Sequence, residues 1–287
     1  MKAIHLPRLG VLRLSGADRL DFLQGQLTQD VMAAGASRSL LWGWNNPKGR
    51  LLALGQLMNQ AETTLLVLPQ ALLEQTMNRL RMFVLRAQVS IEATGLAVGG
   101  LPTDQAAAEM PELSLIADDH ACGHANDRSL MRLAGDPSRA LVLTQETELI
   151  EDPAGVSAWE LADIRAGLPD LWIATAEAFV PQMVNLDILG GISFNKGCYV
   201  GQEVVARTQN LGRIKRRMLR FACPTSADPG GVLTDPQGSS VGKVVRSAPA
   251  DNGHELLAVV QLAAADGPLA LAGQALEPLP LPYPLPD

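Results

Sequence analysis

A short loop that contains a cysteine and a lysine carries the residues best suited to chemistry. It reads Lys196-Gly197-Cys198-Tyr199-Val200-Gly201-Gln202-Glu203. Glycine tolerates backbone angles that other residues avoid, so the two glycines favour a tight, exposed loop. The apolar spacing after Gly201 predicts a short helix whose first turn contains Gln202 and Glu203.

This arrangement favours a thiolate. Cys198 would precede a helix N-terminus and lie two residues from Lys196. Both positive fields would lower the pKa of a thiol below its ordinary value of about 8.5. The other interpretation is a small buried hydrophobic residue, which is a common role of a single cysteine. The residues alone leave both interpretations open.

Three other segments accompany this loop: F-L-Q-G-Q-L-T-Q-D at residues 22–30, N-P-K-G-R at residues 46–50, and I-R-A-G-L-P at residues 164–169. Together with K-G-C-Y-V-G-Q-E, V-V-A-R-T and K-R-R, they resemble the signature of the YgfZ family. Members of that family are folate-binding relatives of the glycine-cleavage T-protein, an aminomethyltransferase. The resemblance spans most of the chain, in the order that the family has.

The resemblance implies an α+β fold like that of the T-protein, with two mixed α/β domains and a C-terminal β-barrel around a central folate channel. We expect residues 1–45 and 145–205 to form a discontinuous folate-binding domain. Residues 46–144 would form a second α+β domain, and residues 206–287 the barrel.

Residue patterning supports a mixed fold. Apolar spacing predicts strands near residues 11–14, 40–58, 64–68, 88–93 and 140–143, and helices over residues 69–84 and 157–166. Residues 95–110 are rich in Ala, Gly and Pro and predict a loop, with room for one short helix. Short strands between turn residues follow from residue 218 onward, and the proline-rich tail is expected to lie extended along the body.

The resemblance also implies a site for tetrahydrofolate or a derivative. Cys198 and Lys196 would be the working residues. Arg165, Gln182 and Asn185 would bind the folate, and the two amides offer both donors and acceptors to a pterin ring. The other expected folate-binding residues are Tyr199, Gln202, Glu203, Lys48 and Arg50. For Lys48 and Arg50 a second interpretation is open, namely two solvated charges on a loop.

The implied function is support of the assembly or repair of iron–sulfur enzymes, including radical enzymes that modify tRNA. Its partners would be folate and iron–sulfur client or assembly proteins. The alternative is a tetrahydrofolate-dependent aminomethyltransferase of the T-protein type. T-proteins carry an aspartate pair shortly after the glycine turn that corresponds to Gly49, where this chain has Ala53 and Leu54. Without a titratable group, acid–base assistance to amine departure is disfavoured.

A basic run between Arg207 and Arg220 has three open interpretations: a solvated face, an RNA contact, or recognition of the glutamate tail of folate. The net charge is −7 and no stacking aromatic residues interleave with the run, so direct nucleic-acid binding is disfavoured.

The remaining features predict a soluble, cytoplasmic monomer without membrane contact. Three cysteines without a C-x-x-C pair fit a reducing compartment. The N-terminus lacks the apolar core of a signal peptide, and polar residues interrupt the most apolar region, residues 51–69. His120, Cys122 and His124 offer metal-ligand types, but neighbouring turn residues favour a loop there and no fourth ligand is evident, so no metal site is expected.

Overall fold

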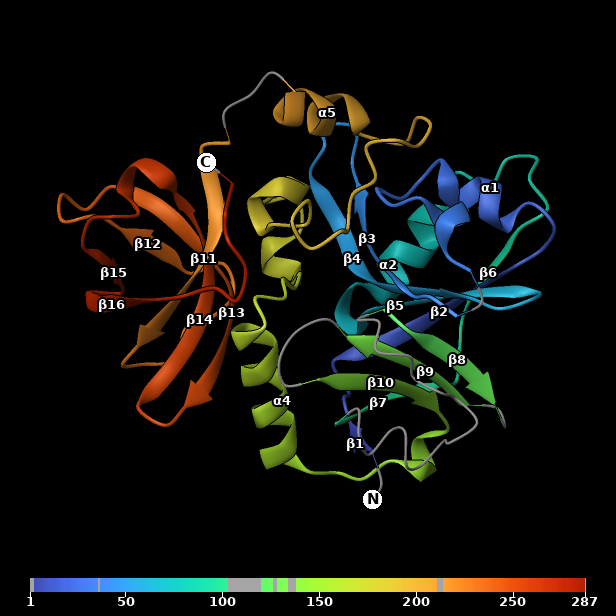
Figure 1. Cartoon of the computed structure of the whole chain (residues 1–287), viewed down its shortest axis with the longest axis horizontal. Coiled ribbons are helices and arrows are strands. Elements are labelled where there is room, and N and C mark those ends of the chain that lie inside the picture. The colour runs from blue at the N-terminus through green and yellow to red at the C-terminus, as the bar shows by residue number, and fades with distance from the viewer. Residues whose placement is uncertain are drawn as a thin grey trace.

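The computed structural model describes residues 3–35, 37–102, 120–125, 128–133, 138–210 and 214–286. Two five-stranded sheets and a closed six-stranded barrel make up the described strands (Figure 1). The expected α+β architecture with a C-terminal barrel is therefore confirmed.

The first sheet has the order β3-β4-β5-β2-β6. Its strands are β2 (Leu9–Ser15), β3 (Leu40–Asn45), β4 (Leu51–Asn59), β5 (Thr63–Pro69) and β6 (Ser90–Ala93). Helices α1 (Arg19–Gln24) and α2 (Gln70–Arg81) contribute Leu23 and Leu73 to a core around Trp42 and Trp44. Strands β3 and β4 pair along their length, so the expected domain division between residues 45 and 46 falls within one sheet.

The second sheet has the order β1-β7-β10-β9-β8. Its strands are β1 (Ile4–His5), β7 (Ala97–Pro102), β8 (Cys122–Ala125), β9 (Arg128–Leu133) and β10 (Arg139–Thr144). The expected loop at residues 95–110 is wrong over β7, and its residues 103–110 lie outside the part of the chain that the structure describes. A Cβ on Gly100 would come within 2.6 Å of the Trp159 ring, so this strand needs glycine for close packing rather than for a turn.

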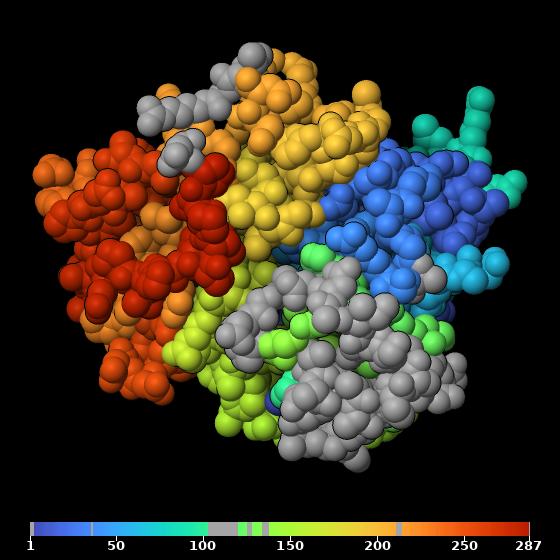
Figure 2. Space-filling model, in the orientation of Figure 1, coloured from blue at the N-terminus to red at the C-terminus, as the bar shows by residue number. Residues whose placement is uncertain are grey.

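The barrel closes in the order β11-β14-β13-β12-β15-β16. Its strands are β11 (Arg216–Cys223), β12 (Val232–Thr234), β13 (Ser240–Ala250), β14 (Gly253–Gln261), β15 (Leu269–Leu271) and β16 (Gln274–Leu279). The C-terminal tail continues beside β11, and the Tyr283 hydroxyl donates to the carbonyl oxygen of Gly167 at 2.8 Å. The tail therefore lies extended along the body, as expected, and Figure 2 shows this segment against the middle of the chain.

Helix α4 (Pro153–Arg165) lies between the barrel and the second sheet (Figure 1). Asp152 caps it by accepting from the Gly155 amide. A shared core that includes Ile164, Val184 and Leu257 joins α4 and the barrel to the segment around 3-10 helix η4 (Pro181–Val184). No helix in the described part of the chain is long and apolar enough to cross a membrane.

Candidate functional site

The loop of residues 190–201, here called the signature loop, leads from the η4 region into helix α5 (Gln202–Asn210). This helix confirms the sequence prediction, with Gln202 and Glu203 in its first turn. The Gln202 side-chain oxygen accepts from the Tyr199 amide at 3.3 Å, which closes the end of the loop onto the helix. Glu203 instead points to solvent and pairs with Arg207 at 2.6 Å.

Two glycines join the signature loop to the β3–β4 turn. Gly201 has a φ of 78° and Gly49 a φ of 69°, both in the left-handed region. A Cβ on Gly201 would lie 2.5 Å from the carbonyl oxygen of Asn46, and one on Gly49 would lie 2.7 Å from the Val204 Cβ. Only glycine allows the two backbones to approach this closely.

Lys196 fixes the other side of the signature loop. Its ammonium donates to the carbonyl oxygens of Gln24, Leu27 and Gln29 at 2.6, 2.7 and 2.8 Å. Burial lowers the pKa of Lys196 to about 8, and the nearby Asp30 opposes that change. All three ammonium protons are thus used by backbone oxygens. The side chain crosses to the segment after α1 and holds the loop there.

Cys198 is exposed, whereas Cys122 and Cys223 are buried. The space around neighbouring Gly197 is open. Burial raises the pKa of the Cys122 thiol to about 12, which keeps that group protonated. The exposure of Cys198 agrees with the expected open loop, and its reactivity stays a prediction.

The aromatic residue of the motif is buried. The Tyr199 ring centroid lies 5.2 Å from the Lys196 ammonium, a distance compatible with a cation–π contact. Burial raises the pKa of the Tyr199 hydroxyl to about 12. Tyr199 therefore packs under the loop beside the lysine rather than facing solvent.

Arg165, Gln182 and Asn185 each bond to neighbouring segments, and none of them lines the two cavities described below. Arg165 makes two hydrogen bonds to Glu255 of the barrel, at 2.8 and 3.1 Å, and this contact raises its pKa. Gln182 and Asn185 are completely buried, and their amide nitrogens donate to backbone carbonyls of Val205 and Met218. Their side-chain oxygens have no partner among the described residues.

A cavity of about 290 Å³, here called the basic cavity, lies between the start of β4, the segment before and within η4, and the barrel. Its lining residues are Arg50, Ala178, Phe179, Met183, Arg216, Ser240, Gly242, Lys243 and Val259. The Arg50 guanidinium donates to the carbonyl oxygen of Ala178 at 2.7 Å, which orients it at the wall. Of the two turn cations named from the sequence, Arg50 lines this cavity, while Lys48 is exposed and does not.

Two of the cavity cations depend on the barrel for their position. Arg216 belongs to the basic run between Arg207 and Arg220, which is evident in the sequence. Lys243 lies outside that run and in no motif. Arg216 pairs with Gln261 of β14, and Lys243 pairs with Val259 on the other side of the same strand. The pairing of β11 and β13 with the two edges of β14 brings these two residues together, and their spacing in the sequence does not indicate it.

A second cavity, of about 80 Å³, lies where both sheets and the barrel meet. Its polar lining includes Arg8, Gln56, Asp163, Asp170 and Arg246. Arg246 pairs with Asp163 at 3.0 Å and also with Glu160, whose pKa is held below its usual range by Arg246 and Arg8 against the opposing effect of burial. This central cavity is smaller than the roughly 150 Å³ that accommodates a benzene ring.

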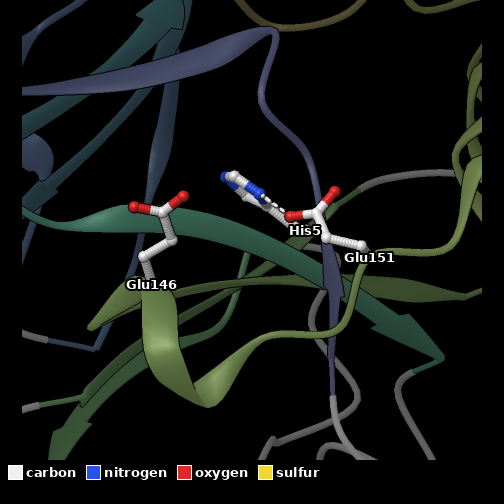
Figure 3. A group of neighbouring side chains, drawn as sticks. All are labelled: His5, Glu146 and Glu151. Carbon is white, nitrogen blue, oxygen red and sulfur yellow. Dashed lines mark hydrogen bonds and ion pairs between the residues drawn. The ribbon is translucent and has the colours of Figure 1, made fainter.

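The histidines named as metal-ligand types are not gathered. Cys122 and His124 lie on β8, where Cys122 is buried and His124 is exposed with its Nδ1 3.0 Å from the Ser129 hydroxyl. Within the described residues, the group with metal-ligand atoms in proximity is His5, Glu146 and Glu151 (Figure 3). The His5 Nδ1 lies 2.6 Å from a Glu151 oxygen, so a hydrogen bond accounts for the proximity of these two residues without a metal.

Comparison with solved structures identifies the class of fold. The fold is similar to that of the glycine cleavage system aminomethyltransferase T from Bartonella henselae, with a TM-score of 0.68 over 98% of this chain and 87% of that chain. The sequence identity is 15%, so this likeness establishes the aminomethyltransferase fold alone. No family model matches the chain.

Two relatives in sequence are named tRNA-modifying protein YgfZ. The protein from Colwellia psychrerythraea is 35% identical over 225 residues, which cover 75% of this chain and 69% of the relative. The protein from Yersinia pseudotuberculosis serotype IB is 32% identical over 238 residues, which cover 79% and 72%. The chain belongs to the YgfZ family of tRNA-modifying proteins.

Proposed function

We propose that this chain is a cytoplasmic folate-binding protein that supports the assembly or repair of iron–sulfur enzymes, including radical enzymes that modify tRNA. The names of the YgfZ relatives support the connection with tRNA modification. The observation that carries the folate proposal is the basic cavity, whose Arg50 follows the turn that packs against the signature loop.

The residues of the basic cavity fit a reduced folate. Folates are anionic through their glutamate carboxylates, and Arg50, Arg216 and Lys243 supply cations that form no ion pair with a described residue. Phe179, Met183 and Val259 supply apolar surface for the aryl part. The volume of about 290 Å³ exceeds what a single ring needs. Tetrahydrofolate or a derivative would be held there, and when bound it supplies a one-carbon unit.

Cys198 is the working residue of the proposal because it is the exposed thiol of the signature loop. A thiol at the surface can reach a partner protein, and its thiolate is both a nucleophile and a soft metal ligand. Lys196 acts as a positioning residue, since its ammonium ties the loop to the backbone after α1. An iron–sulfur client would therefore meet a thiol on a fixed loop.

The T-protein reaction is not favoured by the corresponding positions. Ala53 and Leu54 are buried in β4, and Leu54 lines the central cavity. Neither side chain can exchange a proton with an amine. The similarity in fold does not imply the aminomethyltransferase reaction, because the reaction depends on the residues of the site.

Calorimetric titration with tetrahydrofolate and its methylene and formyl forms tests the folate proposal. We expect wild-type protein to bind at least one form and Lys243→Ala to bind it about 10-fold more weakly, for loss of one charge-assisted contact. Arg13→Ala is the matched control, because Arg13 forms an exposed pair with Glu92 away from the cavity. If wild-type protein binds no reduced folate, the proposal is wrong.

A complementation assay tests the iron–sulfur part. In cells that lack their own YgfZ, wild-type protein should restore the activity of a radical iron–sulfur enzyme that modifies tRNA, and Cys198→Ala should not. Folate affinity of Cys198→Ala should stay near that of wild type, because Cys198 does not line the basic cavity. Full restoration by Cys198→Ala would remove the thiol from the proposed function.

A further inference from the structure

We propose that the folate bound by this chain is a poly-γ-glutamyl form, whose extended anionic tail occupies a second, adjoining basic cavity. This inference rests on the folate-binding function proposed above and names its ligand more closely. The adjoining cavity has a volume of about 500 Å³ and is lined by Ile214, Lys215, Arg216, Gln261, Leu262 and Ala263. Arg216 lines both cavities and marks the place where they adjoin.

Strand register sets out the order of the cations. Arg216 on β11 is opposite Gln261, and Lys243 on β13 is opposite Val259, two residues earlier on β14. Residues directly opposite each other, and residues two apart on a strand, point to the same face of a sheet. Lys243 and Arg216 therefore follow one face of the barrel from the basic cavity toward the adjoining one, where Lys215 stands next.

The cations that line the two cavities differ from neighbouring arginines of the barrel in their ion pairing. Arg217 pairs with Asp187 at 2.6 Å, and Arg220 pairs with Glu255 at 2.7 Å. Lys215, Arg216 and Lys243 form no ion pair with any residue that the structure describes. In a chain with net charge −7, unpaired cations gathered at two adjoining cavities indicate an anionic ligand.

The ligand chemistry that fits is a chain of carboxylates. Each additional γ-glutamyl unit adds one carboxylate, and arginine and lysine side chains bind carboxylates through charge-assisted hydrogen bonds. A single glutamate would engage the cations of the basic cavity and leave Lys215 unused. An RNA strand fits less well, because single-stranded RNA is recognised by stacking on exposed aromatic residues. The one aromatic residue among the described lining residues is Phe179, and it is buried.

The experiment compares calorimetric affinities of tetrahydrofolate carrying one, three and five glutamates. We expect the triglutamate to bind wild-type protein about 10-fold more tightly than the monoglutamate, as one or two added ion contacts in a partly enclosed site would give. In Lys215→Ala this ratio should fall toward one. Arg86→Ala, which removes an exposed cation outside both cavities, should keep the wild-type ratio.

The outcomes separate the inference from the function on which it rests. Equal affinity for mono- and triglutamate in wild-type protein overturns the inference and leaves folate binding intact. No affinity for any glutamate form overturns the folate-binding function itself. Displacement of the pentaglutamate by a tRNA transcript at comparable concentration would show that the cations serve RNA, and this also overturns the inference.

Discussion

Gly201 lies against Gly49: a Cβ built on Gly201 would be 3.0 Å from the Gly49 Cα. The first glycine ends the signature loop, and the second belongs to the β3–β4 turn, whose next residue, Arg50, lines the basic cavity. Packing between these two backbones is the direct physical link between the exposed Cys198 loop and the proposed folate site. Since the contact needs two glycines in left-handed conformations, it is sensitive to a single added methyl group.

Gly201→Ala should therefore destabilise the protein. The substitution combines a φ of 78° with a contact of 2.5 Å to the Asn46 carbonyl oxygen, and we expect a loss of at least about 1–2 kcal/mol in the free energy of unfolding. Gly197→Ala in the same loop is the matched control, because a Cβ there meets open space, and its effect should stay within about 0.5 kcal/mol. Urea unfolding measures both; similar losses in the two variants would contradict this account.

Lys196→Met should destabilise the protein as well, because it leaves the carbonyl oxygens of Gln24, Leu27 and Gln29 without their donor. We expect a loss of about 1–3 kcal/mol in the free energy of unfolding. A lysine in an exposed loop could be removed at little cost, but these three contacts tie Lys196 to a distant segment. Lys48→Met, at an exposed position, is the control in urea unfolding. Equal stability of the two variants would show that the contacts contribute nothing.

Transfer of an aminomethyl group from a lipoyl carrier to tetrahydrofolate should not occur at a rate comparable with that of a T-protein. The resemblance to T-proteins would place acids at Ala53 and Leu54, but both side chains here are apolar and buried and cannot exchange a proton. The measurement is a T-protein assay with a genuine aminomethyltransferase alongside. A comparable rate would mean that another group of the central cavity, such as Asp163 or Asp170, supplies the acid.

Local pattern was sufficient for much of the fold. The paired strands β3 and β4, helix α2 and helix α5 all have the apolar spacing or turn residues that predict them. Strand β7 was missed because its glycines serve close packing under Trp159, a tertiary requirement that resembles a turn in sequence. Propensity cannot separate these two uses of glycine.

The sequence indicates the local features of the candidate site, but it does not indicate the contacts between distant segments. The helix after the loop follows from the loop sequence, whereas the exposure of Cys198, which the residues left open, comes from the structure. The partners of Lys196 lie more than 160 residues away, and Arg165 is engaged by Glu255 of the barrel. Such contacts depend on how three units pack together, which no spacing within one segment encodes. The position of Lys243 beside the basic cavity is not evident from the sequence for the same reason.

The last prediction concerns the order in which the cysteines react. Cys198 is exposed, while Cys122 and Cys223 are buried. The thiolate is the reacting species, and burial raises the pKa of Cys122 to about 12, so that thiol stays protonated throughout the range from pH 7 to 9. Cys198 should therefore be alkylated first by iodoacetamide. Unfolding should remove the difference, because it exposes all three thiols at their ordinary pKa.

Mass spectrometry of each cysteine-containing peptide, at a series of pH values, measures the three rates. Cys198 should react fastest at each pH, whereas Cys122 should stay slow up to pH 9 because its thiolate is not yet formed. Cys198→Ala should leave the melting temperature nearly unchanged, since an exposed side chain contributes little packing. If Cys198 reacts no faster than the buried cysteines at neutral pH, or if Cys198→Ala unfolds the protein, the thiol is structural and the reactive role must be abandoned.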